Sequence, residues 1–164
     1  MANKIYQIEE LGRRWAVADP MDESLTLDGL AALSVRQGDQ WDRGASARPT
    51  RYLWRLVLDG FATNPVIGES VLLYIAGSNG IDHDADLGVS DAAATVDQLL
   101  NCRQIGSVQV MTTSTFDIHT GSGLVDIFDR YVTPVIFNRT NDALASAGTP
   151  VHYLELTPVS DEIQ

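Results

Sequence analysis

Apolar and polar residues alternate along the stretch from Arg51 to Asp59, which is the pattern of a β-strand with one buried face. The side chains on its apolar face are Tyr52, Trp54, Leu56 and Leu58. After turn-forming pairs at Asp59-Gly60 and Asn64-Pro65, a second run from Glu69 to Ala76 is apolar at nearly every position. Such a run is typical of a strand that is covered on both faces. We therefore expect these two strands to form the centre of a β-sheet core.

The residues before this pair predict one more strand and a long loop. Residues 24–33 are expected to form a strand, because the β-branched Thr26 lies between two leucines and Gly29 would weaken a helix. A short helix is the alternative for this segment. Residues 34–50 are rich in glycine, serine, aspartate and arginine around Trp41, which is the composition of a loop.

The residues after the central pair predict a short helix, a strand and another loop. Residues 91–100 suit one short helix with Ser90 as its N-cap. Residues 103–113 alternate and predict a half-buried strand. The serine, threonine and glycine content of residues 113–123 predicts a loop that carries His119.

The last third of the chain predicts three short strands. Residues 124–139 are expected to form two of them with a kink at Thr133-Pro134. Because proline cannot donate a hydrogen bond to a neighbouring strand, it is expected at an edge, a bulge or the start of a strand. Residues 151–157 predict a final alternating strand. Seven or eight short strands with little helix predict an all-β fold, an antiparallel β-sandwich of the jelly-roll kind.

The length of 164 residues indicates one domain, and we expect a short extension at each end of it. Residues 1–23 mix charges with isolated apolar residues and close on Asp19-Pro20, so they predict an N-terminal arm. The β-sandwich is expected over residues 24–159, and residues 160–164 are an acidic tail. An arm with aromatic residues either folds back on its own domain or clasps a neighbour.

The charge balance is strongly acidic. The chain has 11 basic and 22 acidic residues, a net charge of −11, which opposes binding to nucleic acid or to an anionic membrane. Ten of the basic residues are arginines, and five of these lie between Arg36 and Arg55. Guanidinium groups pair well with carboxylates, so this cluster suits contact with a protein, with a solvated loop as the alternative. No run is long enough for a membrane span and no signal-peptide pattern opens the chain, so we expect synthesis in a cytoplasm.

The histidines and the cysteine do not form a catalytic or metal-binding motif. His83, His119 and His152 lack the spacing of a metal site or a catalytic triad. The single Cys102 has no such motif around it and is expected to be a buried, small apolar residue. We therefore expect neither an enzyme nor a cofactor.

An acidic loop from Asp82 to Asp91 begins with the D-x-D-x-D spacing of a calcium loop. The sixth and twelfth positions of that motif would need glycine and a carboxylate, but they fall on Leu87 and Ala93. A solvated loop is favoured over a calcium site of another kind.

Taken in order, five stretches resemble the small capsid decoration, or cement, proteins of tailed bacteriophages. These stretches are LTLDGLAALSVRQGDQWD, TRYLWRLVLDG, GESVLLYIAGSNG, LLNCRQIGSVQV and RYVTPVIFNRTNDALASAGTPVHYLELTPV. The resemblance implies a jelly-roll-like sandwich on the outside of a capsid, where it braces junctions between major capsid protein subunits. It also implies assembly into a homo-oligomer, with a trimer favoured.

Two groups of residues are the predicted contacts with the capsid protein. The arm contributes Tyr6, Ile8, Leu11 and Trp15. The arginine-rich loop contributes Arg36, Trp41, Arg43 and Arg48.

The alternative is a carbohydrate-binding module on a phage tail or surface. In that case exposed aromatic residues would hold the sugar, and the candidates are Trp15, Trp41, Tyr52 and Trp54. Trp54 is expected in the core, because it lies on the apolar face of its strand. A cupin-like enzyme is the weakest reading, since its metal site would need histidines clustered in one strand.

Overall fold

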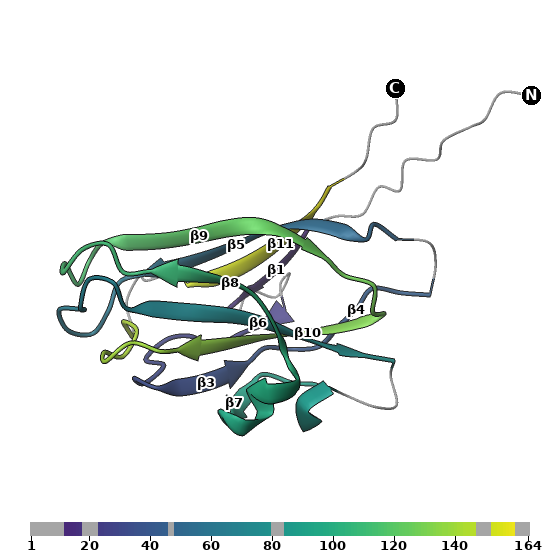
Figure 1. Ribbon diagram of the computed structural model, residues 1–164, viewed down its shortest axis with the longest axis horizontal. Coiled ribbons are helices and arrows are strands. Elements are labelled where there is room, and N and C mark those ends of the chain that lie inside the picture. Colours follow the sequence, from purple (N-terminus) through teal and green to yellow (C-terminus); the bar gives the residue numbers. More distant parts are fainter. Residues whose placement is uncertain (1–11, 18–22, 46–47, 80–83, 147–151, 160–164) are drawn as a thin grey trace, which may run out of the picture.

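The computed structural model describes residues 12–17, 23–45, 48–79, 84–146 and 152–159, which form two stacked β-sheets (Figure 1). Sheet A has the order β2 (Glu23–Ser24), β1 (Arg13–Ala16), β11 (Tyr153–Pro158), β5 (Arg51–Asp59) and β9 (Ile118–Asp126). Sheet B has the order β7 (Ala92–Ala94), β3 (Ser34–Gln37), β10 (Tyr131–Asn138), β6 (Ser70–Ser78) and β8 (Arg103–Gln109), and β4 (Trp41–Asp42) also pairs with β10. Among the described strands only β1 and β2 pair in parallel. The predicted all-β antiparallel sandwich is therefore confirmed.

The eight longest of the described strands pair as a nested set. The first pairs with the last, β1 with β11, and inside this pair come β3 with β10, β5 with β9, and β6 with β8. The pairs β5–β11 and β6–β10 then join these into two sheets. Successive nested pairs alternate between the sheets, so each sheet combines strands from the two halves of the chain.

Strand β5 is the main contributor of sheet A to the core. Its apolar face, Tyr52, Trp54, Leu56 and Leu58, is buried between the sheets as the alternation predicts. Burying one side chain of this size contributes about 1.5–3 kcal/mol relative to leaving it in water. The pairing of apolar faces across the two sheets is thus what holds the sandwich together.

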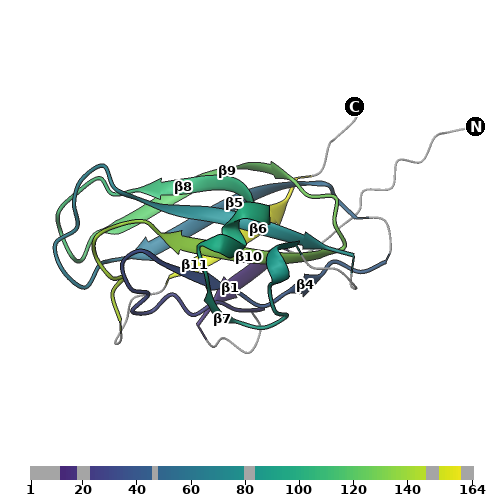
Figure 2. The ribbon, with the colours of Figure 1, turned by 60° about the horizontal axis from the view of Figure 1, so that its bottom comes forward.

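Strand β6 is covered on both faces, as its nearly continuous apolar sequence predicts. One face lies in the core between the sheets, and the other is covered by the segment that contains the short helices η1 (Asp84–Asp86) and η2 (Asp97–Asn101). Leu87 and Leu99 of this segment pack with Ala76 and Val135 in a second, smaller apolar cluster. Figure 2 shows the segment lying across β6 and β10.

The prediction of a strand over residues 24–33 is wrong, because strand β2 ends at Ser24. Both leucines that were expected to face inward are buried, but the backbone then turns at Gly29, whose φ is +66°. The side-chain amide of Asn138 donates to the carbonyl groups of Leu30 and Ala31 at 3.1 and 3.2 Å. The loop is therefore held by side-chain hydrogen bonds from β10, together with backbone bonds such as that from the Leu25 N–H to the Ala16 carbonyl at 3.2 Å.

The loop predicted over residues 34–50 contains strands β3 and β4, both of which pair with β10. The gap between them faces Pro134, whose carbonyl accepts a hydrogen bond from the Gly38 N–H at 2.9 Å. Because the N–H and C=O of one residue in a strand point to the same neighbour, the N–H that Pro134 lacks falls at this gap. Strand β10 therefore continues through Pro134, and the predicted division into two strands at the Thr133-Pro134 kink is wrong.

The helix predicted over residues 91–100 is mostly absent. Ala92–Ala94 form the edge strand β7, and only Asp97–Asn101 is helical. The helix is preceded by Val96 and has no side-chain cap, so the predicted role of Ser90 is wrong. The Asp91 side chain is instead bound by residues of other segments, which places the alanines beside β3.

The loop predicted over residues 113–123 contains the first six of the nine residues of β9, which begins at Ile118. Glycines 121 and 123 pair with Leu56 and Trp54, so they share the inward face of the sheet. Because glycine has no side chain, the inward positions 121 and 123 do not show the apolar residues that would mark a strand with one buried face.

The sandwich begins earlier than the predicted boundary at residue 24. Strand β1 pairs with β11 along its whole length, and Trp15 is 0% exposed in the main core. The prediction of an arm is therefore wrong for residues 13–16, which belong to the sandwich. The arm residues Tyr6, Ile8 and Leu11, like the tail 160–164, lie outside the described residues.

Candidate functional site

Both tryptophans that were predicted as contact residues are core residues. Trp15 is fully buried, and its indole Nε1 donates to the Asp39 carbonyl at 2.9 Å. Trp41 is also buried, with its ring edge-on to Trp15 and to Tyr52 at centroid distances of 6.0 Å. Together with the burial of Trp54, this removes all four aromatic residues that were predicted to bind a sugar.

Arg43 points inward and holds two loops together. Its guanidinium donates to the Tyr52 hydroxyl at 2.9 Å and to the carbonyls of Ile127 and Asp129 at 3.0 and 2.7 Å, and it also bonds the carbonyl of Pro49. Carbonyl dipoles and two aromatic rings thus replace the water around this buried charge. The structure gives Arg43 a role inside the fold in place of the predicted exposed position.

Arg36 is bound to Asp91 and is not a free cation on the surface. Its Nε and Nη2 donate to the two carboxylate oxygens at 2.6 and 2.9 Å. Burial alone would raise the pKa of Asp91, but hydrogen bonds from Arg36 and Thr26 outweigh it and hold the pKa below its usual value. Arg48 is half-buried and bonds the carbonyl of Gly44. The predicted arginine-rich contact loop is therefore largely used for internal contacts.

The titratable side chains do not converge on a reaction centre in the part of the chain that the structure describes. No group of three or more His, Cys, Asp or Glu there is arranged to hold a metal ion. The buried His152 accepts a hydrogen bond from the Asp59 N–H through Nδ1 at 3.0 Å and donates through Nε2 to the Ala145 carbonyl at 3.0 Å. Cys102 is half-buried beside the smaller apolar cluster. His83 and Asp82 of the acidic loop lie outside the described residues.

His119 is buried beside Phe61, and its Nε2 has no hydrogen-bond partner among the described residues. Burial lowers the pKa of the imidazole below its ordinary value of 6.5, although the charge of Asp117 opposes the shift.

We expect the free energy of unfolding to fall as the pH drops below 6.5, because the unfolded chain then binds a proton that the folded chain resists. The limiting slope is about 1.4 kcal/mol per pH unit for one group. Urea unfolding between pH 7 and pH 5 checks this. His119→Gln should flatten the slope, and an unchanged slope in the variant would remove His119 as its source.

An exposed apolar surface lies at one end of the sandwich, on the β5–β6 and β8–β9 loops and the start of β9. We call it the apolar tip and define it by Val66, Ile67, Met111, Phe116 and Ile118. All five side chains are more than half exposed, and Phe116 is 89% exposed. Figures 1 and 2 both show these loops together at the end of the molecule opposite the start of β1 and the end of β11.

Backbone hydrogen bonds join the two loops that carry the apolar tip. The Gly68 N–H donates to the Val110 carbonyl at 3.0 Å, and the Val110 N–H donates to the Glu69 carbonyl at 2.9 Å. Phe61 donates to the Thr115 carbonyl at 3.0 Å on the other side. These bonds hold the backbones of the two loops against each other. The apolar and polar pattern of the chain does not predict this surface. Its only sign in the sequence is the presence of apolar residues inside predicted turns, as at Val66-Ile67 between a proline and a glycine.

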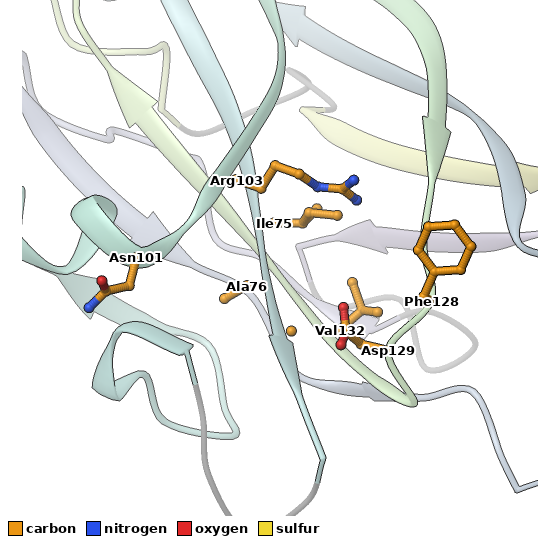
Figure 3. Close-up of a pocket in the computed structure, with 8 residues that line it drawn as sticks. Ile75, Ala76, Asn101, Arg103, Phe128, Asp129 and Val132 are labelled. Carbon is orange, nitrogen blue, oxygen red and sulfur yellow. The ribbon is translucent and has the colours of Figure 1, made fainter.

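A small pocket lies at the opposite end, between sheet B and the β9–β10 loop. Its volume is about 240 Å³, and it is lined by Ile75, Ala76, Gly77, Asn101, Arg103, Phe128, Asp129 and Val132. Figure 3 shows the Arg103 guanidinium directed towards the Phe128 ring, with the Asp129 carboxylate near Val132. The lining of the pocket therefore combines a cation, an anion, an exposed aromatic ring and aliphatic residues.

No protein-family model, no curated protein and no solved structure matches this chain. None of the helices in the described segments is long and apolar enough to cross a membrane.

Proposed function

We propose that this chain is a non-enzymatic structural protein of a bacteriophage virion, which binds the outside of the capsid and stabilises junctions between major capsid protein subunits. The apolar tip is the observation that carries the proposal. Exposed apolar side chains gathered at one end of a molecule can mark a site of protein contact, because it costs free energy to leave apolar surface in water. A tip that projects from a sandwich can insert between subunits of a lattice.

Assembly as a trimer would give the contact enough area. A specific protein interface buries roughly 1,000 Å² or more, which is more than two loops of one small sandwich present. Three tips around a local three-fold axis would bind the lattice together. A protein that binds the assembled shell but not free subunits stabilises the shell by mass action.

The strand pairing and the charge favour the same role. The nested pairing of the eight longest described strands is the order we assign to a jelly roll, the fold that the resemblance to decoration proteins implies. The net charge of −11 opposes contact with packaged DNA and keeps the molecule on the outer side of the shell. The charged groups Arg43, Arg36 and Asp91 serve the fold itself.

A triple variant of the tip tests the proposal. Ile67→Ser, Met111→Ser and Phe116→Ser together should weaken co-sedimentation with capsids stripped of decoration proteins by at least roughly tenfold, because each buried apolar side chain contributes about 1.5–3 kcal/mol. The matched control is Leu100→Ser with Phe128→Ser, two exposed apolar residues outside the tip. Equal binding by both variants, or no binding by the wild type, would rule the proposal out.

A further inference from the structure

We propose that the pocket beside the β9–β10 loop binds one ring of a neutral sugar. This site lies at the opposite end from the apolar tip and does not depend on the capsid role. Nor does it involve the aromatic residues that the sequence suggested for sugar binding, which are buried.

The charges of the pocket favour a neutral polar ligand over an ionic one. Arg103 supplies N–H donors in a fixed fork, and Asp129 supplies two acceptor oxygens. One cation and one anion cancel in net charge, so neither an anion nor a cation is selected. Neighbouring hydroxyl groups of a sugar ring can both donate and accept, which matches this pair of side chains.

The apolar lining supplies the other half of sugar recognition. The lining includes Ile75 and Val132, which belong to the main apolar core, and the exposed ring of Phe128, which is 71% exposed. A sugar ring has an apolar face of C–H groups that can lie against an aromatic ring, while its edge carries the hydroxyls. Ligand pockets in general combine an apolar lining with a few placed polar groups.

Hydrogen bonds hold the backbone of the β9–β10 loop, which carries Phe128, so the site is already formed without a ligand. Arg43 binds the carbonyls of Ile127 and Asp129, and its own N–H donates to the Arg130 carbonyl at 2.9 Å. The Ile127 N–H donates to the Thr50 carbonyl at 2.6 Å. Hydrogen bonds from the Arg43 side chain to the backbone thus hold both neighbours of Phe128, and a preformed site loses little entropy when it binds.

Further contacts hold Arg103 and the end of the loop, and the Asp129 carboxylate lies beside Gly77. The Arg130 guanidinium forms two 2.8 Å bonds to the carboxylate of Asp42. Arg103 is held by a 2.5 Å bond from Nη2 to the Asp126 carbonyl. The Asp129 carboxyl group occupies the space beside Gly77, where an added Cβ would lie 2.5 Å from its carbon. Any larger residue at position 77 would displace this carboxylate.

The size of the pocket limits the ligand to one ring. Sites for drug-sized ligands are about 300–1,000 Å³, and this pocket is smaller. A ligand of about a dozen heavy atoms in an open site is expected to bind with a Kd on the order of 1 mM, so several pockets on one particle would be needed for firm attachment.

Titration of the ¹⁵N-labelled full chain with methyl glycosides of glucose, galactose, mannose, rhamnose and N-acetylglucosamine tests the proposal by NMR. At least one glycoside should shift the amide signals of Gly77, Arg103 and Asp129. Phe128→Ala and Asp129→Asn should each weaken that binding at least tenfold, and Gly77→Ala should do the same through the displaced carboxylate. The matched control is Phe116→Ala, another exposed phenylalanine, which should leave it unchanged.

Three results would overturn the proposal. They are no shifts with any glycoside at concentrations well above millimolar, larger shifts with sodium phosphate or the zwitterion alanine than with every glycoside, and glycoside binding that survives Phe128→Ala. Phe128→Ala should keep full co-sedimentation with capsids. Failure of the sugar site therefore leaves the capsid role standing, and failure of the capsid role leaves the sugar site standing.

Discussion

Replacement of Gly106 by alanine is expected to cost several kcal/mol of folding free energy and to leave little folded protein. A Cβ on residue 106 would lie 2.0 Å from Cζ2 of Trp54, a distance that no packing adjustment of the ring alone can absorb. On the other side of the indole, a Cβ on Gly123 would lie 2.8 Å from its Nε1. The ring therefore fills a slot between glycines of the two sheets and cannot move aside.

The expected size of this effect follows from what is lost if the indole leaves the core. Loss of a buried large aromatic side chain costs about 3–5 kcal/mol, and a domain of this kind has a total stability of about 5–15 kcal/mol. Chemical unfolding measures the change. Gly88→Ala is the control, because its added Cβ meets only the end of the Gln37 side chain at 3.4 Å.

The coupling between the two residues is tested by a double-mutant cycle. In a Trp54→Leu background the slot is partly empty, so Gly106→Ala should cost much less than it does in the wild type. A single Gly106→Ala variant as stable as the wild type would show that the indole does not occupy this slot.

Replacement of Arg43 by methionine is expected to destabilise the fold by about 2–5 kcal/mol, because each buried polar group left without a partner costs about 1–3 kcal/mol. The carbonyls of Ile127 and Asp129 and the Tyr52 hydroxyl would lose the guanidinium donor, whereas the Pro49 carbonyl would keep its bond from the Tyr52 hydroxyl at 3.2 Å. Methionine has nearly the same length, so the loss of hydrogen bonds outweighs any loss of packing. Thermal and urea unfolding give the change.

The control for this variant is Arg55→Met, which alters an exposed arginine on β5 and should change the stability by less than about 0.5 kcal/mol. Hydrogen exchange adds a local readout. Amides of residues 127–130 should exchange faster in Arg43→Met than in Arg55→Met. Equal stability of the two variants would mean that the buried guanidinium does not hold the β9–β10 loop.

The fold class and four long strands follow from local patterns. Alternation places the inward face of β5, and the unbroken apolar run of β6 predicts its two covered faces, because both patterns depend only on what each face of the strand meets. Strands β8 and β11 follow from the same alternation. The first part of strand β9 is not predicted by alternation, because Gly121 and Gly123 occupy inward positions where Trp54 and the opposite sheet fill the space of a side chain.

The residues of the candidate site are harder to predict from the sequence, because the exposure of a side chain depends on residues that are distant along the chain. Arg43 was expected outside on account of its charge, yet the carbonyls that accept its hydrogen bonds come from residues 49, 127 and 129. Trp15 was assigned to an arm, since four residues of β1 are too few to show a period. The exposure of Phe116 and Phe128 cannot be predicted from the sequence, because it depends on which other segments of the fold pack against them.

A cryo-electron microscopy reconstruction of capsids saturated with the protein tests most directly whether this molecule acts by adhering to a protein lattice through its apolar tip. We expect sandwich-shaped density on the outer surface, in threes around local three-fold axes, with the β5–β6 and β8–β9 loops against the major capsid protein. A shell without added density, or a sandwich that meets the shell with the pocket end and leaves Phe116 in solvent, would contradict the account.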